Sequence, residues 1–204
     1  MEIETIIFDL GGVLFNINHE RTRAALSALS ENPEKINFSL LSQNEVFNQF
    51  EAGRITSAQF RNELRSLYGI SGSDSEIDSA WNAMLIGLFP DSIDMLQSLK
   101  QSYRIALLSN INDIHYSAIE QECLPLFLEL HDCFLSYSLG LRKPEHEIYQ
   151  HVLKAMNVIP EKTLFIDDAP QNIQTARSLG IQTYHVTSQN PLRGILKSIT
   201  KGKL

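Results

Sequence analysis

The sequence is poor in cysteine and in long apolar stretches, and each shortage excludes a class of protein. Only Cys123 and Cys133 occur in 204 residues. Two cysteines are too few for a disulfide scaffold and are not at the spacing of a metal site, so we expect two reduced thiols. No apolar run approaches the roughly 20 residues of a membrane span. Glu2 and Glu4 stand where a signal peptide would be positive. We therefore expect a cytoplasmic protein without a membrane partner.

Basic residues are also scarce. The chain has 17 Lys and Arg against 24 Asp and Glu, which gives a net charge of -7. A protein of this charge, without a run of Lys or Arg, is not expected to bind nucleic acid. Its 43% hydrophobic content is enough for a sizeable core, and its length suits one domain with a modest insertion. Nothing in the pattern indicates a particular oligomeric state.

Short apolar segments alternate with helical patterns along most of the chain. Nearly continuous apolar character, as in the first, second and fourth segments, is typical of strands buried on both faces. Strands that alternate with helices predict an α/β fold with a parallel sheet covered on both sides. The strand segments are Thr5 to Phe8, Arg104 to Leu108, Cys133 to Ser136 (the weakest), Thr163 to Ile166 and Thr183 to Val186. The helical patterns are Asp91 to Lys100, Glu145 to Met156 and Gln171 to Leu179.

The interval from residue 16 to residue 88 breaks this alternation. It shows no convincing strand, only turns and helical patterns, including one through Phe60, Leu64 and Leu67 that Thr56 or Ser57 is expected to cap. About seventy residues is more than a strand-to-helix connection needs, and long connections in compact domains are usually functional lids. We therefore expect a helical cap at residues 16–88, inserted into a core of residues 1–15 and 89–204.

Polar residues follow the predicted strands at the ends that line the binding crevice of a parallel sheet. Taken alone, each has an ordinary explanation as a turn or cap residue. Two adjacent aspartates are less ordinary, because unpaired like charges repel unless a cation is near. Together, at one edge of one sheet, these residues indicate an active site. They are Asp9, Ser109 with Asn110, Lys143 before Pro144, and Asp167 with Asp168.

Phosphoryl transfer is the chemistry that this set suits. An aspartate is ionised at neutral pH and can attack phosphorus to give an aspartyl-phosphate. Because a carboxylate repels a phosphate dianion, a hard cation such as Mg²⁺ is needed between them. Asp9 and Asp168 fit as its ligands, with Asp167 as an outer or additional ligand. Lys143 would place a positive charge on the phosphate, and the Ser109 hydroxyl and backbone N–H groups would bind its oxygens.

Four segments in this order resemble the motifs of a known family: "IIFDLGGVLF", "ALLSN", "RKPEHEIY" and "LFIDDAPQNI". With the long insertion, they resemble the haloacid dehalogenase-like hydrolase superfamily, in its subfamily with a small helical cap, over essentially the whole chain. The "FDLG" form is similar to that of hexose-1-phosphate phosphatases. The resemblance implies a Rossmann-like core, Asp9 as nucleophile, and Gly11 (through its carbonyl) and Asp168 as magnesium ligands. It also implies that Ser109 and Lys143 hold the phosphate.

Two positions depart from the family pattern. Phosphatases of the superfamily usually carry an aspartate where Gly11 stands, as general acid and base. That help is typically worth about 10²–10⁴-fold in rate, so its loss favours a good leaving group, such as the anomeric oxygen of a sugar 1-phosphate. A cap residue or an ordered water is expected to replace the missing acid. His19, Glu20 and Glu51 are the candidate residues, although a surface position is the ordinary interpretation of each.

The second departure is Asn172, four residues after Asp168, where an acid is common in the family. It is expected either to orient Asp168 or Lys143 or to cap the following helix.

The cap is expected to choose a small phosphorylated substrate by closing over the crevice. Its segment "FNQFEAGRIT" resembles a cap segment of the same subgroup. Phe47, Phe50 and Trp81 are expected to pack rather than to recognise substrate. The candidate phosphate- and substrate-binding residues are Gly11, Gly12, Asn16, Ser109, Asn110, Asn112 and Lys143, with His115 a weaker candidate.

Two other functions remain open. Displacement of halide from carbon by Asp9 needs no leaving-group acid, which keeps a 2-haloacid dehalogenase in view; the paired Asp167 and Asp168 argue against it, because that reaction needs no cation. Gly11 keeps a non-catalytic regulator that binds a phosphorylated ligand in view. The retention of Asp9 argues against this alternative, because a binding module needs no nucleophile.

Overall fold

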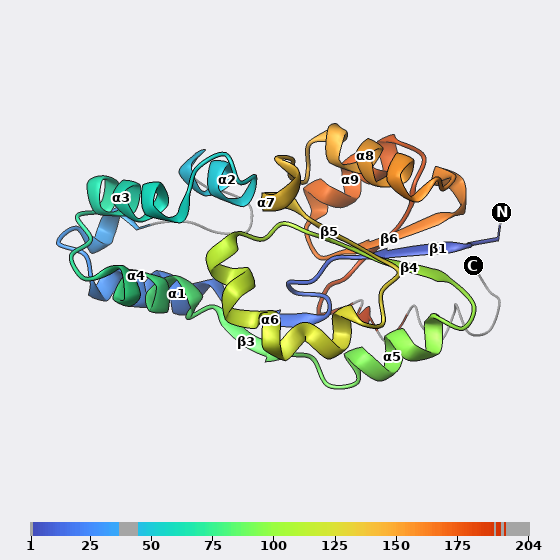
Figure 1. Ribbon diagram of the computed structural model, residues 1–204, viewed down its shortest axis with the longest axis horizontal. Coiled ribbons are helices and arrows are strands. Elements are labelled where there is room, and N and C mark those ends of the chain that lie inside the picture. The colour runs from blue at the N-terminus through green and yellow to red at the C-terminus, as the bar shows by residue number, and fades with distance from the viewer. Residues whose placement is uncertain (1, 37–44, 190, 193, 195–204) are drawn as a thin grey trace.

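The computed structural model describes residues 2–36, 45–189, 191, 192 and 194. At its centre is a five-stranded parallel sheet of order β5-β4-β1-β6-β7, so the first strand of the chain lies in the middle (Figure 1). All five segments predicted as strands are strands, each within one residue of its expected bounds. They are β1 (Thr5–Phe8), β4 (Arg104–Ser109), β5 (Asp132–Leu135), β6 (Thr163–Asp167) and β7 (Gln182–His185).

Helices cover both faces of the sheet. Ile6 and Phe8 of β1 join an apolar cluster with α5 and α6, whereas Ile7 joins a second cluster with α8 and α9. Figure 1 shows these helix pairs on opposite sides of the strands. Burial on both faces is the reason that these strands have continuous apolar sequences. The predicted α/β fold, a Rossmann-like parallel sheet, is confirmed. The helices are α5 (Ser92–Leu99), α6 (Asp113–Phe127), α7 (Ser136–Leu139), α8 (His146–Met156) and α9 (Pro170–Ser178), with a 3₁₀ turn at Pro160–Lys162.

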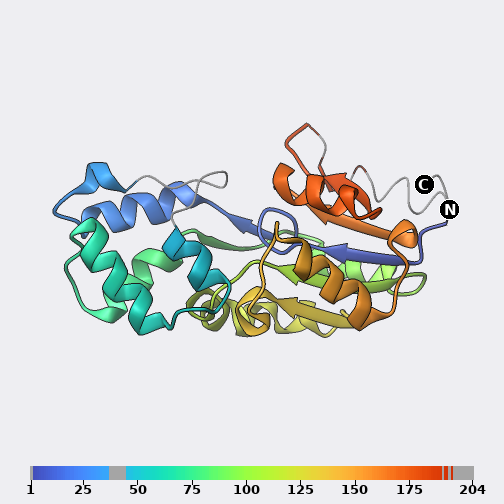
Figure 2. The same ribbon diagram turned by 90° about the horizontal axis from the view of Figure 1, so that it is seen from above.

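The interval expected to hold no strand contains one at each end, so that prediction was wrong there. β2 (Phe15–Ile17) and β3 (Leu85–Leu88) pair antiparallel in a small separate sheet. β2 has three residues and β3 contains Gly87, so neither is long or regular enough to show the alternation of a strand. The two strands connect the central sheet with the helices that follow β2 (Figure 2).

The helices between β2 and β3 pack around a separate apolar cluster beyond one end of the sheet, which Ile114 of α6 also joins (Figures 1 and 2). Phe47 stacks on Trp81 with ring centroids 5.4 Å apart, and Phe50 stacks on Phe60 at 4.1 Å. Phe47, Phe50 and Trp81 therefore pack as expected, and Phe47 and Trp81 also line the cavity described below. These helices are α1 (His19–Ala28), α2 (Glu45–Glu51), α3 (Ser57–Tyr68) and α4 (Asp74–Asn82), with a 3₁₀ turn at Pro33–Lys35.

Helix α3 forms where its sequence pattern placed it. Thr56 is the N-cap and shares a capping box with Gln59. Phe60 and Leu64 are buried as expected, but Leu67 is 40% exposed. The apolar face of α3 is therefore narrower than its sequence suggested.

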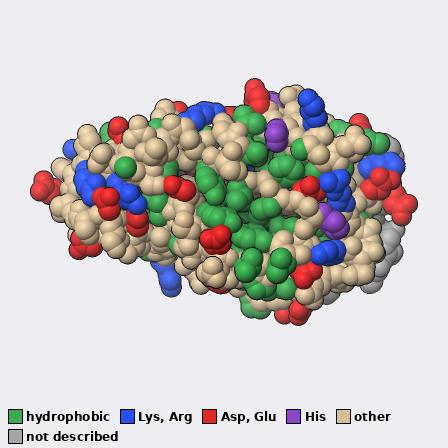
Figure 3. All heavy atoms as spheres, viewed as in Figure 1, with side chains coloured by type: hydrophobic (Ala, Val, Ile, Leu, Met, Phe, Trp, Pro, Cys, Tyr) green, Lys and Arg blue, Asp and Glu red, His purple; other side chains and the backbone are tan. Residues whose placement is uncertain are grey.

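No helix in the described part of the chain is long and apolar enough to cross a bilayer. Hydrophobic side chains do gather near the middle of the face in Figure 3. Helix α6 and its C-cap carry two exposed apolar residues, Leu124 and Leu128. Exposed apolar atoms are ordinary on globular proteins, and these indicate no particular function.

Candidate active site

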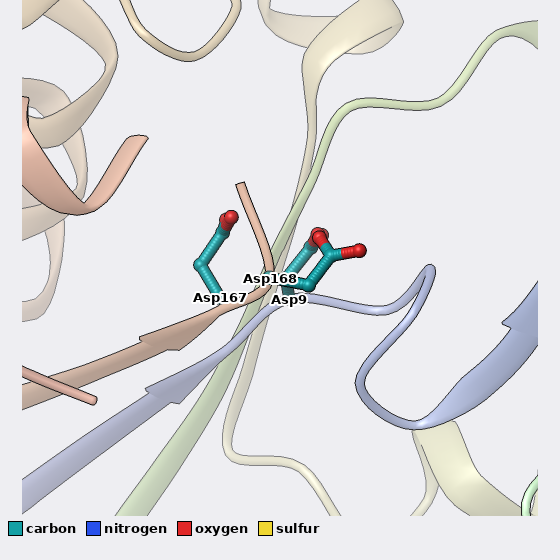
Figure 4. Close-up of side chains that lie close together, drawn as sticks. All are labelled: Asp9, Asp167 and Asp168. Atoms are coloured by element: carbon teal, nitrogen blue, oxygen red, sulfur yellow. The ribbon is translucent and has the colours of Figure 1, made fainter. Parts of the chain in front are cut away.

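Three aspartates meet where neighbouring strands end. Asp9 directly follows β1, Asp167 is the last residue of β6, and Asp168 comes next (Figure 4). Because β1 and β6 are parallel neighbours, their carboxyl ends lie side by side. One carboxylate oxygen from each aspartate lies within 4.8 Å of the others. The structure therefore places these three carboxylates close together, as their positions after neighbouring strands predicted.

Lys143 lies between two of these carboxylates. Its Nζ is 2.9 Å from Asp9 Oδ1 and 2.7 Å from Asp167 Oδ2, and its side chain is 1% exposed. Burial alone would lower the pKa of Lys143, but the charges of Asp167 and Asp9 outweigh it and the net shift is upward. Lys143 is therefore a fixed positive charge at the carboxylate that is the candidate nucleophile.

Asp167 is held mainly by this lysine and by Asn172. The Asn172 Nδ2 donates to both Asp167 carboxylate oxygens at 3.0 Å, and the Ala169 N–H donates to Oδ1 at 2.8 Å. Asn172 thus orients Asp167 rather than Asp168. It does not cap the helix, because the N-cap of α9 is Ala169. Its effect on Lys143 passes through Asp167.

Asn110 fixes the backbone of the same lysine. Its Nδ2 donates to the Lys143 carbonyl at 2.8 Å, and the Lys143 N–H donates to its Oδ1 at 2.9 Å. The Lys143–Pro144 peptide bond is cis. These reciprocal bonds show Asn110 as a support for Lys143. Ser109, which ends β4, is 2% exposed and lines the cavity described below.

The carboxylates fit a hard cation. Burial raises the pKa of Asp9 to about 8; Lys143 opposes this shift, and Asp167 and Asp168 add to it. Burial, followed by the charge of Asp167, raises the pKa of Asp168 to about 6. Because burial and neighbouring negative charge raise both pKa values, an additional positive charge would stabilise the ionised forms of Asp9 and Asp168. Since the donors are all oxygens, the set suits magnesium better than a soft metal.

The two glycines after Asp9 occupy different surroundings. Gly12 has a φ of +73°, and a Cβ there would lie 2.1 Å from Asp168 Oδ2, so only glycine permits this approach. Gly11 has no positive φ, and its Cβ would lie 3.1 Å from Ile17 Cδ1. The space where an acid would stand at residue 11 is thus partly filled by Ile17.

A cavity of about 580 Å³ joins the strand ends to the helices that follow β2. Its polar side chains come from both parts of the chain. Gly12, Asn16 and Asn112 lie outside its lining: Asn16 is paired with Gly87 in the β2–β3 sheet, and Asn112 caps α6. As substrate contacts these three remain predictions. The polar lining residues include Asp9, His19, Asn48, Glu51, Ser109, Asn110, His115, Arg142, Lys143, Asp168, Gln171 and Asn172.

Asn48, Arg142 and Gln171 were not singled out from the sequence. Arg142 forms an ion pair of 2.8 Å with Glu51 of α2, and both side chains are largely buried. Arg142 directly precedes Lys143, and Asn48 lies in the segment "FNQFEAGRIT" singled out above, so their neighbours were the available signal. The ion pair itself joins residues 91 positions apart, which no local pattern reveals.

The two histidines of the cavity differ in their partners. His115 contacts Asn112 Nδ2 through Nδ1 and the Trp81 carbonyl through Nε2, and burial lowers its pKa to about 4. The Nε2 of His19 is buried and has no hydrogen-bond partner among the residues that the structure describes. Glu20, the next candidate replacement acid, is exposed and pairs with Arg23.

Comparison with known proteins agrees with this geometry. A family model described as haloacid dehalogenase-like hydrolase matches residues 3–180. The chain is 31% identical over 187 residues to the D-ribitol-5-phosphate phosphatase of Bacteroides thetaiotaomicron, covering 89% of this chain and 91% of that one. It is 30% identical over 186 residues to the sesquiterpene phosphatase astK of Aspergillus oryzae, covering 89% and 88%.

A solved structure is also similar over nearly its whole length. It is a HAD family enzyme of Bacteroides thetaiotaomicron in complex with magnesium and inorganic phosphate, with a TM-score of 0.83 and 33% identity. The match covers 95% of this chain and 98% of that one. By its motifs, its fold and these matches, the chain belongs to the haloacid dehalogenase-like hydrolase family.

Proposed function

We propose that the chain is a magnesium-dependent phosphomonoester hydrolase that acts on a small phosphorylated metabolite through an aspartyl-phosphate on Asp9. One observation carries the proposal: Asp9, Lys143 and Asp168 meet at the strand ends and line one cavity. The relatives named above are phosphatases, and a similar enzyme was crystallised with magnesium and phosphate. Both facts support the same chemistry.

The reaction has two displacements at phosphorus. A carboxylate oxygen of Asp9 forms a bond to phosphorus while the bond to the ester oxygen breaks. The departing oxygen takes a proton from a donor in the cavity and leaves as the alcohol. Water then attacks the aspartyl-phosphate, loses a proton and regenerates the Asp9 carboxylate. Lys143 balances negative charge on the transferred phosphoryl group from its position beside Asp9.

The metal site in this proposal consists of Asp9, Asp168 and the carbonyl of Gly11. When bound there, magnesium offsets the repulsion between the carboxylates and the phosphate. Asp167 was proposed from the sequence as an outer or additional ligand. Its bonds to Lys143, Asn172 and the Ala169 N–H favour the outer position.

The Ser109 hydroxyl is proposed to bind phosphate, with backbone N–H groups near Asn110 adding donors. The proposed cap, residues 16–88, covers the core of residues 1–15 and 89–204 and selects the substrate. Its contributions to the cavity include His19, Glu51 and Trp81. A sugar 1-phosphate is the proposed substrate because its anomeric oxygen leaves readily. The proposed site of action is the cytoplasm.

The two alternatives account for fewer of these observations. A dehalogenase does not need a metal ion, whereas the group of three carboxylates could hold one. A non-catalytic phosphate-binding regulator does not need a nucleophile held by a buried lysine. Neither is favoured by a specific contact in the structure.

The test is a panel of phosphate esters assayed for phosphate release with and without Mg²⁺, using wild type and Asp9→Asn. The proposal expects release that requires Mg²⁺ and is lost in the variant. Release that ignores Mg²⁺, or that survives in Asp9→Asn, would overturn it. Halide release from 2-haloacids, with no phosphate release from any ester, would support the dehalogenase instead.

A further inference from the structure

The proposed reaction needs a proton donor for the leaving alkoxide, and residue 11 cannot supply it. Gly11 has no side chain, and Ile17 lies 3.1 Å from the point that its Cβ would occupy. A leaving group poorer than an anomeric or aryl oxygen departs slowly unless it is protonated. Another group in the cavity must therefore serve such substrates.

Most titratable side chains of the cavity are already engaged. Asp9 and Lys143 contact each other, and Asp168 belongs to the proposed metal site. Glu51 and Arg142 form an ion pair. No Asp, Glu or His occurs at the residues outside the described ranges, so no side-chain carboxylate or imidazole from there can take the role.

The two histidines of the cavity are the remaining candidates for the proton donor. Both ring nitrogens of His115 have contacts, to Asn112 and to the Trp81 carbonyl. His19 lines the same cavity as Asp9, and its buried Nε2 has no partner in the described part of the chain. A buried polar atom without a partner carries a desolvation penalty, which a bound ligand can remove. The described residues therefore leave the hydrogen-bonding capacity of this nitrogen unused.

The position of His19 in the fold suits this role. It is the first residue of α1, directly after the N-cap Asn18, whose side chain accepts from the Glu20 N–H. The short strand β2 ends at Ile17, and only the N-cap Asn18 separates it from His19, so His19 lies at the connection between the sheets and the following helices. A substrate held by its phosphate at Asp9 would occupy the cavity that His19 also lines.

We propose that His19 hydrogen-bonds the leaving-group oxygen through Nε2 and supplies the proton that Gly11 cannot. In the first displacement the ester P–O bond breaks, the Asp9 O–P bond forms, and the Nε2 proton passes to the departing oxygen. In the second, water bonds to phosphorus, the Asp9 O–P bond breaks, and Nε2 takes a proton from that water. The imidazole thus returns to its initial state. This inference rests on the proposed phosphatase function.

The charged surroundings of His19 set the direction of its pH dependence. Burial lowers the pKa of His19, and the charge of Glu20 opposes that shift. His115 of α6 faces it as a second imidazole, and its own pKa is lowered in part by His19. Across the cavity stand the charged side chains of Asp9, Glu51, Arg142, Lys143 and Asp168. The fraction of His19 that is protonated therefore falls as pH rises through a pKa that lies below the ordinary value of 6.5.

The test compares two esters with Mg²⁺ present: an alkyl sugar phosphate and p-nitrophenyl phosphate, whose leaving group needs no proton. In His19→Ala and His19→Gln, kcat/KM for the alkyl ester should fall about 100-fold, at the lower end of the usual range for general acid help. The aryl ester should change little. Added imidazole should partly restore His19→Ala on the alkyl ester. The matched control is Arg21→Gln, an exposed position of α1 outside the cavity lining, which should leave the ratio of the two rates unchanged.

In wild type the ratio of alkyl to aryl rates should fall as pH rises, and His19→Gln should remove this dependence. Equal losses on both esters, or no loss on either, would overturn the role of His19 while leaving the phosphatase function standing. Circular dichroism distinguishes a loss of activity from a loss of folding in His19→Ala. If His19→Ala does not fold, His19→Gln is used for the test. Absence of Mg²⁺-dependent release from both esters in wild type would overturn the proposed function, and this inference with it.

Discussion

Replacing Asp9 with asparagine should abolish turnover and yet stabilise the Mg²⁺-free protein at alkaline pH. Burial raises the pKa of Asp9 from 3.8 to about 8. Between these values the folded protein binds more protons at this group than the unfolded chain does. Its free energy of unfolding must therefore decrease as pH rises through that window. The asparagine of the variant carries no such penalty, because its side chain does not ionise.

The size of the effect follows from linkage. One group contributes at most about 1.4 kcal/mol per pH unit, so from pH 5 to pH 8 wild type should lose up to about 4 kcal/mol relative to Asp9→Asn. Asp168 also titrates, but it is common to both proteins. The loss of one of the two carboxylate partners of Lys143 acts in the opposite direction; Asp167 remains at 2.7 Å.

The assay is urea unfolding of both proteins with EDTA at several pH values. The difference in unfolding free energy should grow in favour of Asp9→Asn as pH rises, and Mg²⁺ should reverse it by stabilising wild type alone. A difference that is constant from pH 5 to pH 8 would refute the argument that buried charge at Asp9 is unfavourable without a cation.

Three further changes test the supports of the site. Asn172→Ala removes two hydrogen bonds to buried Asp167. It should lower the unfolding free energy by about 1–3 kcal/mol and should also lower kcat. An unchanged urea midpoint and an unchanged kcat would contradict the proposed support of Asp167 by Asn172. In the His19→Ala background, Gly11→Asp combined with Ile17→Val, which makes room at the 3.1 Å contact, should restore kcat on alkyl phosphates more than on aryl phosphates. An equal effect on both would contradict the account of the missing acid. Glu51→Gln breaks a largely buried ion pair and should raise KM for sugar phosphates more than for p-nitrophenyl phosphate, as steady-state kinetics would show; parallel changes would remove its role in substrate selection.

The sequence predicted the sheet and the strand-end residues because both depend on local signals. β1 and β6 are nearly continuous apolar runs that lead into Asp9 and Asp167. Such runs are the usual sequence form of strands that are buried on both faces. Parallel pairing then brings the ends of these strands together. The same reasoning could not find β2, because three residues at the edge of a two-stranded sheet carry too little pattern.

The residues that sequence reasoning missed or left undecided depend on contacts between distant segments. Arg142 has the same sequence character as any surface arginine until Glu51 is placed beside it. His19 was one of three candidate acids; burial of its Nε2 without a partner in the described part of the chain separates it from Glu20 and from Glu51. The role of Asn172 depends on two contacts that the sequence does not reveal: Asp167 binds Lys143, and Asn172 orients Asp167.

The central claim is that Asp9 carries the phosphoryl group during turnover. Wild type mixed with a phosphate ester and Mg²⁺, quenched in acid within one turnover and digested, should yield by mass spectrometry a phosphorylated peptide whose added group lies on Asp9. The same protein in EDTA, and Asp9→Asn in Mg²⁺, should yield none. A phosphorylated residue other than Asp9, or steady release of phosphate with no adduct at any quench time, would contradict the account.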